Sequence, residues 1–437
     1  MKNDTFDLIV AGGGFAGVAA AVSAARCGLR VLLLEKSNSL GGAAVNCLVN
    51  PFMAFRAGAF DKSGRFVPFS QGIFEEIVQS LQEFDGDTAI EGAVFNEEYL
   101  KIILNRLVLQ SGVQILFHAC LISAETETAF VPPEQEQLGR TALKSITVTT
   151  AARTLRFYAD YFIDATGDAA LAYLSGFPCR LGRSGDHLCQ PMTLCFRLAN
   201  VDIPKYIETR GQISPLYNRF QKEGKIKNPR EDVLIFENLI HGVLHFNTTR
   251  IVKLNPTDPF DLTQAELLAR EQVLELFLFL KRNFECFRES QLVMTAPEIG
   301  IRESRMIEGE YLLTGSDLTE RKRFPDTIAL GNYDIDIHNP EGAGTSHHYF
   351  RDGEYYDIPY RSLIPRSSVN LLAAGRCISV DHEAQASIRV MPIVCCIGQA
   401  AGLAAALAAR QQKPVGAVDA GELQELIVQQ HGVVAVD

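Results

Sequence analysis

The first 35 residues carry two short, largely apolar runs on either side of a stretch rich in Ala and Val. The runs are residues 7–11 and 30–35, and the stretch between them is 15–27. An apolar run without alternation is typical of a parallel strand that is covered on both faces. The stretch between them predicts a helix, with Gly28 as its C-terminal cap. Together the three segments predict a βαβ unit.

The pattern then continues through mixed helix and strand signals. It predicts helices over 70–83 and 96–111, a strand over 113–118, alternating strands over 119–157 around a polar loop at 132–136, and a buried strand over 161–164.

From residue 176 the strand patterns become shorter and the loops longer. Thr263-x-x-Glu266 predicts a capping box that begins a Leu- and Phe-rich helix ending near residue 284. Residues 315–357 read mostly as loop. A strand over 370–375 and a long helix of small and apolar residues over 392–410 follow.

Composition places the 437-residue chain among ordinary globular proteins, with 47% apolar and 21% charged residues. Its formal net charge is −11 and it has no basic run, so we expect neither nucleic acid nor a membrane as a partner. The apolar stretch 6–25 is broken by Asp7 and three glycines, which argues against a signal peptide or a membrane helix. Ten cysteines without a CxxC pair predict reduced thiols and a cytoplasmic location.

Gly12, Gly14 and Gly17 form a GxGxxG motif between the first predicted strand and helix. The first glycine permits a tight turn, the second lets the backbone approach a pyrophosphate, and the third lets the helix pack closely. The phosphates would lie at the helix N-terminus, where free N–H groups favour negative charge. Glu35 ends the second strand and is placed to accept hydrogen bonds from ribose hydroxyls. The motif fits NAD as well as FAD.

Later residues favour FAD. Gly41-Gly42 follows Glu35, and the strand at 161–164 ends in Ala165-Thr166-Gly167-Asp168. With these pieces the chain resembles the FAD-dependent oxidoreductases of the glutathione-reductase-like class, and more closely the bacterial family known as FAD-dependent oxidoreductases. The resemblance is also carried by residues 300–305, 358–365, 374–379, 387–392 and 398–402.

The resemblance implies an α/β fold and a cofactor. We expect a FAD/NAD(P)-binding Rossmann-like domain with a central parallel sheet, made of residues 1–175 and 361–437 and interrupted by an inserted α+β cap domain at 176–360. The implied contacts to a non-covalently bound FAD are Gly12, Gly14, Phe15, Ala16, Gly17, Glu35, Lys36, Gly41, Gly42, Ala43, Ala165, Thr166, Gly167, Asp168, Gly375, Arg376, Arg389, Met391, Gly398 and Ala401. Pro392 would begin a helix whose N-terminus stabilises the reduced flavin.

Three departures narrow the class. Only Cys47 follows Gly41-Gly42, so a dithiol relay is not expected; Cys47 is either a flavin neighbour or a small buried residue, and we favour the latter. Gly375-Arg376 stands where aromatic hydroxylases of this class have Gly-Asp. No second GxGxxG follows a strand, so no dedicated NAD(P)H domain is expected.

The sequence offers fewer candidates for catalysis than for cofactor binding. Arg302 and Arg305 would share a face if their segment were helical, and could then clamp a carboxylate; pairing with Glu303, Glu308 or Glu310 is the alternative. His348, of the pair His347-His348, and His382 are candidates for acid–base work or contact with the flavin. No motif suggests a metal.

These observations lead to a functional hypothesis. We expect hydride transfer between FAD and a small organic substrate bound at the domain interface, with NAD(P)H or an electron-transfer partner binding transiently. The alternatives are a flavin-binding electron-transfer or sensor subunit and a flavin monooxygenase or halogenase.

Overall fold

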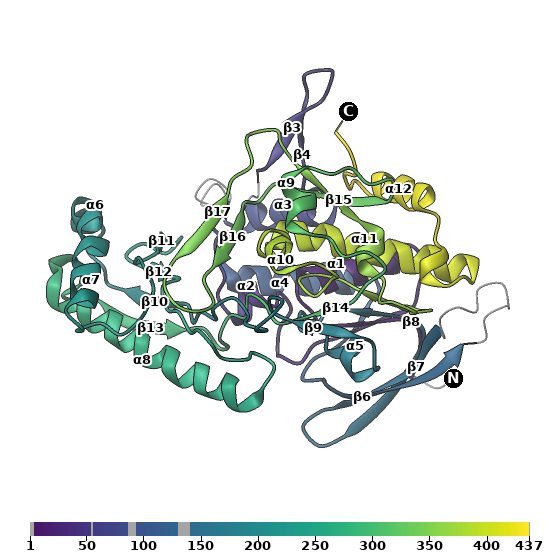
Figure 1. Cartoon of the computed structure of the whole chain (residues 1–437), viewed down its shortest axis with the longest axis horizontal. Coiled ribbons are helices and arrows are strands. Elements are labelled where there is room, and N and C mark those ends of the chain that lie inside the picture. Colours follow the sequence, from purple (N-terminus) through teal and green to yellow (C-terminus); the bar gives the residue numbers. More distant parts are fainter. Residues whose placement is uncertain (1–3, 54–55, 86–92, 130–139, 437) are drawn as a thin grey trace.

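The computed structural model describes residues 4–53, 56–85, 93–129 and 140–436, so the predicted loop at 132–136 lies outside the described residues. Two hydrophobic cores divide the chain (Figure 1). The larger core draws on residues 6–177 and 306–427, which we call the Rossmann-like region. The smaller one runs mainly from Met192 to Ile299, and we call these residues the cap.

The N-terminal segments form the predicted βαβ unit. Strand β1 (Thr5–Ala11) leads into helix α1 (Phe15–Arg26) and then into strand β2 (Val31–Leu34). The two strands are parallel, and all four residues of β2 are buried, as expected of a strand covered on both faces. Gly28 follows the helix with a φ of +94°, which confirms its predicted place after the helix end.

Both ends of the chain meet in one sheet. Strand β8 (Thr154–Asp164) pairs in parallel with β1 and with β19 (Leu371–Ala373), and β2 pairs in parallel with β5 (Gln114–Leu116). On the other part of β8, strands β7 (Arg140–Thr149) and β6 (Cys120–Ala129) add an antiparallel extension. The predicted Rossmann-like fold with a central, mostly parallel sheet is confirmed.

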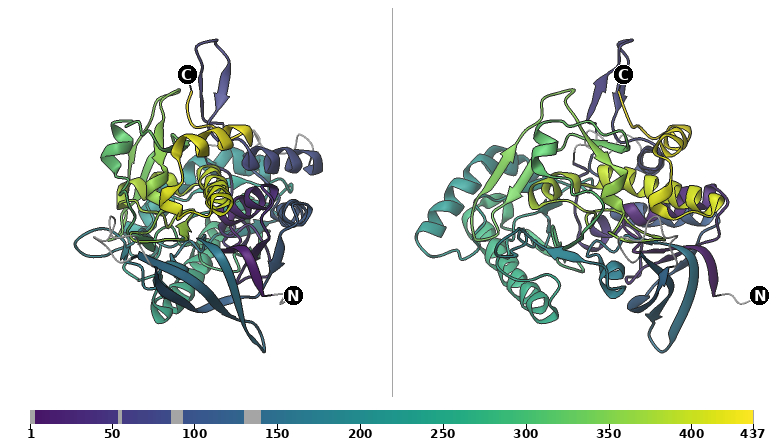
Figure 2. Two further views of the ribbon diagram at one scale, coloured as in Figure 1. Left: turned by 90° about the vertical axis from the view of Figure 1, so that its right-hand side faces the viewer. Right: turned by 45° about the vertical axis from the view of Figure 1, so that its right-hand side comes forward.

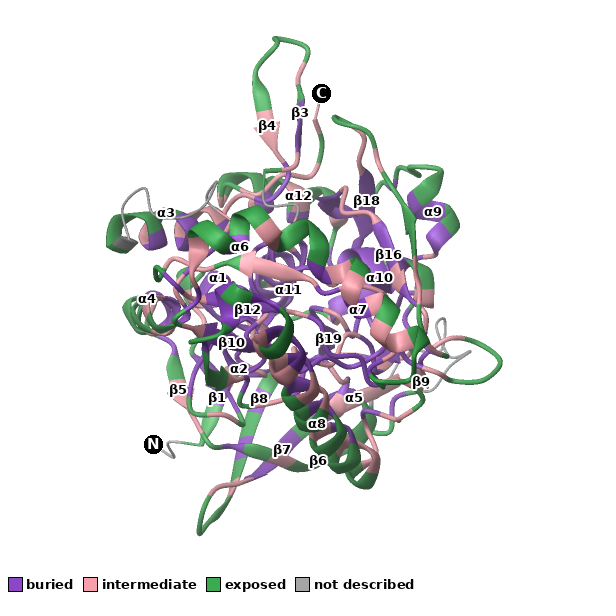
Figure 3. Ribbon diagram, turned by 90° about the vertical axis from the view of Figure 1, so that its left-hand side faces the viewer, coloured by how far each residue is buried: buried purple, intermediate pink, exposed green. Residues whose placement is uncertain are grey.

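Helices cover this sheet, and the longest of them is buried. Besides α1, the Rossmann-like region contains α2 (Ala43–Asn46), α3 (Ile73–Asp85), α4 (Glu97–Gln110), α5 (Ala170–Leu174), α9 (Gly315–Thr319), α10 (His382–Ile388), α11 (Met391–Gln411) and α12 (Ala420–Gln429). Helix α11 is long and apolar enough to cross a membrane, but it is packed inside the protein against α1 (Figure 3). It begins with Met391 and Pro392, as the first-turn proline predicted.

The cap is a four-stranded sheet backed by helices. Its strands lie in the order β11 (Ile235–Glu237), β12 (Leu244–Phe246), β10 (Phe196–Ala199) and β13 (Gln291–Thr295). Helices α6 (Ile203–Thr209), α7 (Ile213–Lys222) and α8 (Pro259–Asn283) complete it, at the left of Figure 1. Phe196 and Phe246 stack with ring centroids 4.6 Å apart on the face that packs with the helices.

The predicted capping box at Thr263 is wrong. Helix α8 begins four residues earlier, at Pro259, and its cap is Asp258, whose carboxylate accepts hydrogen bonds from two backbone N–H groups of the first turn. Thr263 lies inside the helix and donates to the carbonyl oxygen of Pro259. An Asp-Pro start outweighs the later Thr because it offers both a side-chain cap and a preset φ at the first helical position.

The prediction that residues 315–357 are mostly loop missed the short strands in this segment. Strands β15 (Thr327–Gly331) and β18 (Tyr356–Pro359) pair with each other, as do β16 (Ile335–His338) and β17 (Thr345–His348). Strands this short give little alternation to read. The pair β15–β18 packs into the larger core, while the domain boundaries at 175/176 and 360/361 stay predictions.

Two further pairs complete the fold. Strand β9 (Cys179–Leu181) pairs with β14 (Arg305–Ile307), and β3 (Gly58–Phe60) pairs with β4 (Phe66–Pro68). The β3–β4 hairpin projects from the body of the molecule near the C-terminus (Figure 2).

Candidate functional site

A cavity of about 350 Å³ lies where the carboxyl ends of β1, β2 and β8 meet the start of α1. It is lined by all but three of the twenty residues predicted to contact the cofactor. The exceptions are Gly17, Gly398 and Ala401. A Cβ on Gly398 would come within 2.1 Å of the carbonyl oxygen of Ala16, so this glycine lets α11 pack on α1.

The three glycines of the first motif have different tasks. A Cβ on Gly12 would lie 2.3 Å from the carbonyl oxygen of Ala165, and one on Gly17 would lie 1.8 Å from that of Gly12. These two positions are closed by backbone. A Cβ on Gly14 meets only the Cα of Gly42, at 3.8 Å, and Gly14 lines the cavity. Gly14 therefore keeps open the space that a pyrophosphate needs.

The start of α1 and Glu35 supply the polar groups of this wall. Within the described ranges no side chain caps α1, so its first N–H groups are left for an anion. The buried carboxylate of Glu35 accepts from the N–H of Gly13 at 2.6 Å and from that of Ser37 at 2.8 Å. A carboxylate has about four acceptor sites, so Glu35 can still accept from ribose hydroxyls.

Asp168 and Arg376 form an ion pair in the wall of the cavity. The guanidinium of Arg376 donates to Oδ1 of Asp168 at 2.8 Å, and the hydroxyl of Ser304 donates to the same oxygen at 2.6 Å. Burial alone would raise the pKa of Asp168, but Arg376 and Ser304 hold it below its ordinary value. Gly167 has a φ of +80°, and a Cβ there would lie 2.7 Å from Cζ of Arg376. The predicted Ala-Thr-Gly-Asp turn therefore packs directly against Arg376 of the predicted Gly375-Arg376 pair.

Residues of the cap close another part of the wall. Ile299 and Ile301 line the cavity together with Cys47, Arg389 and Met391. The thiol of Cys47 is buried and donates to the carbonyl oxygen of Ile299 at 3.6 Å. Burial raises the pKa of Cys47 to about 12, so it is a neutral thiol at neutral pH. Cys47 is thus both a small buried residue and part of the cavity wall.

The proposed arginine clamp does not form. The segment around Arg302 is not helical, and Arg305 begins strand β14. The guanidinium of Arg305 lies 4.3 Å from the ring centroid of Tyr173, and its Nε donates to the carbonyl oxygen of Asp168. Arg302 points elsewhere and donates to the carbonyl oxygen of Pro191. Extended backbone places the two side chains on different partners.

The two candidate histidines do not line the cavity. His382 is the first residue of α10, and its Nδ1 lies 2.9 Å from the buried carboxylate of Glu303. His348 is exposed and packs edge-on against Phe350. His347, its neighbour on the opposite face of β17, is also exposed, and its Nδ1 lies 2.6 Å from Asp334.

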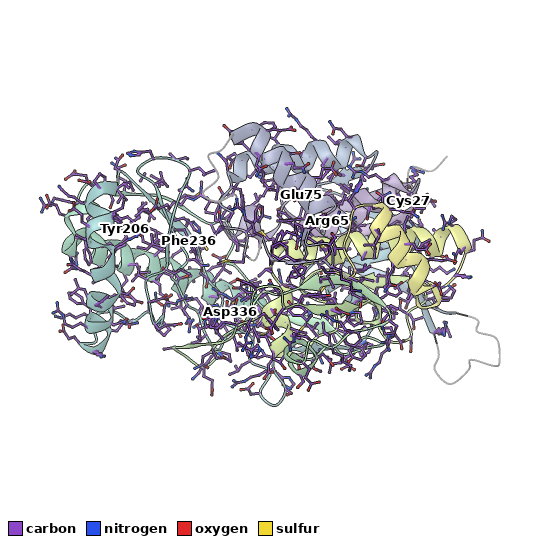
Figure 4. All side chains as sticks on the ribbon, turned by 90° about the horizontal axis from the view of Figure 1, so that it is seen from above. Cys27, Arg65, Glu75, Tyr206, Phe236 and Asp336 are labelled. Atoms are coloured by element: carbon purple, nitrogen blue, oxygen red, sulfur yellow. The ribbon has the colours of Figure 1, made fainter. Side chains whose placement is uncertain are left out.

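Several charged side chains near the cavity carry no motif and were missed. Asp336 lies 3.3 Å from the Arg389 guanidinium and 3.2 Å from Nε2 of His338. Figure 4 labels it toward the middle of the molecule, between Tyr206 and Phe236 of the cap on one side and Cys27 on the other. Burial and the nearby Arg302 lower the pKa of His338 to about 3, so His338 is neutral.

A second missed group lies where the cap sheet faces the Rossmann-like region. Arg197 of β10 pairs with Glu97 of α4, and both side chains are buried. His245, opposite Arg197 in the sheet, is 2% exposed, and neither ring nitrogen has a hydrogen-bond partner among the residues that the structure describes. Burial and Arg197 lower its pKa to about 3. Only strand alternation could have hinted at this face, because none of these residues belongs to a recognisable motif.

Comparison with known proteins gives a family. The profile described as FAD dependent oxidoreductase matches residues 7–427. No protein with a curated description matches significantly. Among solved structures, a geranylgeranyl bacteriochlorophyll reductase-like protein from Thermoplasma acidophilum is similar at 12% identity and a TM-score of 0.46, over 98% of this chain and 84% of that one.

Other similar structures are flavin enzymes with different reactions. The p-nitrophenol 4-monooxygenase of Pseudomonas putida has 11% identity and a TM-score of 0.41, over 98% of this chain and 85% of that one. The flavin-dependent brominase Bmp2 has 10% identity and a TM-score of 0.43, over 98% and 83% of the two chains. Likenesses this distant carry no argument about the reaction.

Proposed function

This chain belongs to the family of FAD-dependent oxidoreductases, and on that premise we propose that it transfers a hydride between FAD and a small organic substrate. FAD is the cofactor of the family, and the glycines, the open start of α1 and Glu35 fit it. When bound, FAD supplies a two-electron centre that accepts or donates a hydride. Everything else in the reaction falls to residues of this chain.

The observation that carries the proposal is the composite wall of the cavity. Ile299 and Ile301 come from the segment that leaves the cap, while Cys47, Arg389 and Met391 come from the Rossmann-like region. Lys36 and Glu298 form an ion pair of 3.0 Å between the same two parts of the chain. Small-molecule sites are commonly found at such interfaces, so a substrate beside this wall would lie against the cofactor.

The residues of the wall have definable tasks in such a reaction. Met391 and Pro392 form the first turn of α11, whose positive end favours the negative charge that a reduced flavin carries. Apolar Ile299 and Ile301 exclude water from the reacting atoms. Arg389 is held against Asp336 and offers a fixed positive charge at the same wall.

We further propose that FAD is held without a covalent bond. Cys47 is a buried, protonated thiol and His382 is held by Glu303, so neither offers a free nucleophile for a covalent link. We also propose that NAD(P)H or an electron-transfer partner binds transiently. We propose a cytoplasmic location, which the ten free cysteines support. We propose the narrower glutathione-reductase-like class as well, which the contact between Gly167 and Arg376 supports.

An anaerobic titration of the purified holoenzyme tests this function. NADH and NADPH are added in turn while the visible flavin band is followed, and a bleached sample is then mixed with candidate acceptors such as unsaturated acids. We expect bleaching by a hydride donor and recovery of the band by an organic acceptor. Flavin that reacts only with a protein partner would instead indicate an electron-transfer subunit. Oxygenated product formed on admitting air would indicate a monooxygenase.

A further inference from the structure

The cap sheet has one apolar and one polar face. Leu194, Phe196 and Leu198 are fully buried in the core formed with α8. Side chains alternate along an extended chain, so Thr193 and Arg197 lie on the opposite face. This polar face is turned toward the Rossmann-like region, because Arg197 pairs there with Glu97 of α4.

Arg302 lies against this polar face and contacts only neutral groups. One terminal nitrogen donates to the carbonyl oxygen of Pro191 at 2.7 Å and to Oγ1 of Thr193 at 2.5 Å. The other reaches Oδ1 of Asn247 at 3.5 Å. Within the described part of the chain, no carboxylate forms an ion pair with it. Arg302 also follows Ile301, which lines the cofactor cavity.

The arginines around Arg302 are all paired, which leaves its charge uncompensated. Arg389 has Asp336 at 3.3 Å, Arg250 has Glu231 at 3.1 Å, and Arg230 has Asp232 at 2.7 Å. The cluster of four guanidiniums and three carboxylates therefore has one positive charge in excess. Burial and the neighbouring Arg389 lower the pKa of Arg302 to about 9, so it is still charged at neutral pH.

The loop that carries Arg302 is fixed from several sides. The fully buried Glu303 accepts from the N–H of Gln190 at 2.8 Å and holds His382. The hydroxyl of Ser304 donates to Asp168 in the cavity wall, and the amide of Gln385 donates to the carbonyl oxygen of Arg302 at 2.6 Å. A guanidinium placed this rigidly loses little entropy when it binds a ligand.

We propose that Arg302 binds a carboxylate of the substrate beside the flavin, and hence that the substrate is a small organic acid. That the bound acid exchanges a hydride with the flavin rests on the proposed function. A carboxylate would supply the missing negative charge and could accept two N–H groups from one guanidinium. Thr193 and Asn247 would orient the guanidinium, and Arg389, which lines the cavity, would add a second positive charge.

Ligand binding to the oxidised holoenzyme tests this assignment. Acetate, crotonate, fumarate and benzoate are the probes, each compared with the uncharged amide of the same acid, and perturbation of the visible flavin band reports binding. We expect at least one acid to bind and its amide to bind far more weakly. In Arg302→Gln the Kd for that acid should rise about 10- to 100-fold, and in Arg302→Lys it should rise less.

Two controls keep the result interpretable. Arg210→Gln removes an exposed guanidinium of the cap and should leave the Kd unchanged. FAD content and melting temperature are measured for each variant, so that a misfolded protein is recognised, and Arg302→Lys then carries the test because it keeps the charge. The proposal is overturned if no acid perturbs the wild-type band, or if Arg302→Gln binds the acids as tightly as the wild type.

The same experiments distinguish substrate binding by Arg302 from stabilisation of the reduced flavin by its charge. If Arg302→Gln lowers the midpoint potential of the flavin while the acid Kd stays the same, the guanidinium serves the reduced flavin and the substrate assignment is wrong. If acids bind through Arg302 but no organic compound exchanges a hydride with the flavin, the acid site stands and the proposed function fails.

Discussion

The two sides of the cofactor cavity are formed by different kinds of protein groups. On the Rossmann-like side, the part at the start of α1 offers backbone and small residues, among them Gly12, Gly14 and Gly42. The side reached from the cap draws on Glu298, Ile299 and Ile301, together with Arg389, and these residues come from separate segments. A pyrophosphate is recognised by backbone N–H groups, which local spacing provides. A substrate is recognised by side chains that only the folded chain brings together.

The largest effect should come from breaking the buried pair that joins the cap sheet to α4. Glu97→Gln leaves Arg197 charged and buried without its partner, and we expect a loss of about 3–5 kcal/mol in the free energy of unfolding. Urea unfolding measures it. The matched control is Glu98→Gln, which removes an exposed pair with Lys101 and should cost about 0.5 kcal/mol or less. Equal losses in the two variants would show that the buried pair does not hold the cap.

On the glycine side, Gly12→Ala should cost about 3 kcal/mol or more. The new Cβ would meet the backbone of Ala165 at 2.3 Å, in addition to the strain of a φ of +103°. Gly28→Ala separates the two causes, because Gly28 has a similar φ of +94° with nothing within 4 Å. That variant should cost about 1 kcal/mol. Thermal unfolding of both apoproteins measures the two losses of stability. A small loss for Gly12→Ala would contradict the close approach of Gly12 to the backbone of Ala165.

A smaller effect should appear in how the free energy of unfolding changes at acid pH. His245 is neutral in the folded protein with a pKa of about 3, whereas an unfolded histidine titrates near 6.5. Its contribution to stability is complete above pH 6.5 and is lost as the pH falls toward 3, because only the unfolded chain binds the proton. Between pH 7 and 5 this amounts to about 2 kcal/mol.

The variant His245→Phe removes this titration and keeps a ring beside Phe236. Its free energy of unfolding should therefore fall by about 2 kcal/mol less than that of the wild type between pH 7 and 5. His348→Phe alters an exposed histidine and should follow the wild type. If His245→Phe loses as much stability in acid as the wild type does, His245 is not kept neutral by burial.

The contrast between the two sides also explains what could be predicted. The glycine motif, Glu35, the turn at Ala165–Asp168 and the pair Gly375-Arg376 are each local in sequence, and the fold places all of them around one cavity. Gly398 and Ala401 were assigned to the cofactor from the family resemblance of residues 398–402. A helix turns successive residues to different faces, and Gly398 faces α1 instead.

The cap side could not be read in the same way. Glu97, Arg197 and His245 come from three elements, and nothing in their spacing announces their meeting. Arg302 and Arg305 were paired on the assumption of a helix. The segment is extended because Gly300 pairs with Thr193 as an isolated bridge and Arg305 opens β14. Short strands formed by distant partners leave no periodic pattern to detect.

The most direct test of the account is an FAD titration of two apoproteins, the wild type and Gly14→Val. A Cβ at Gly14 meets only the Cα of Gly42, at 3.8 Å, and Gly14 lines the cavity in which the pyrophosphate would lie. We expect Gly14→Val to melt at the temperature of the wild type without cofactor and to bind FAD about 100-fold more weakly, which corresponds to about 3 kcal/mol. Gly211→Val, at an exposed glycine of the cap with open space around it, should bind FAD normally. If Gly14→Val binds FAD as tightly as the wild type, the cofactor does not lie where the structure places its cavity.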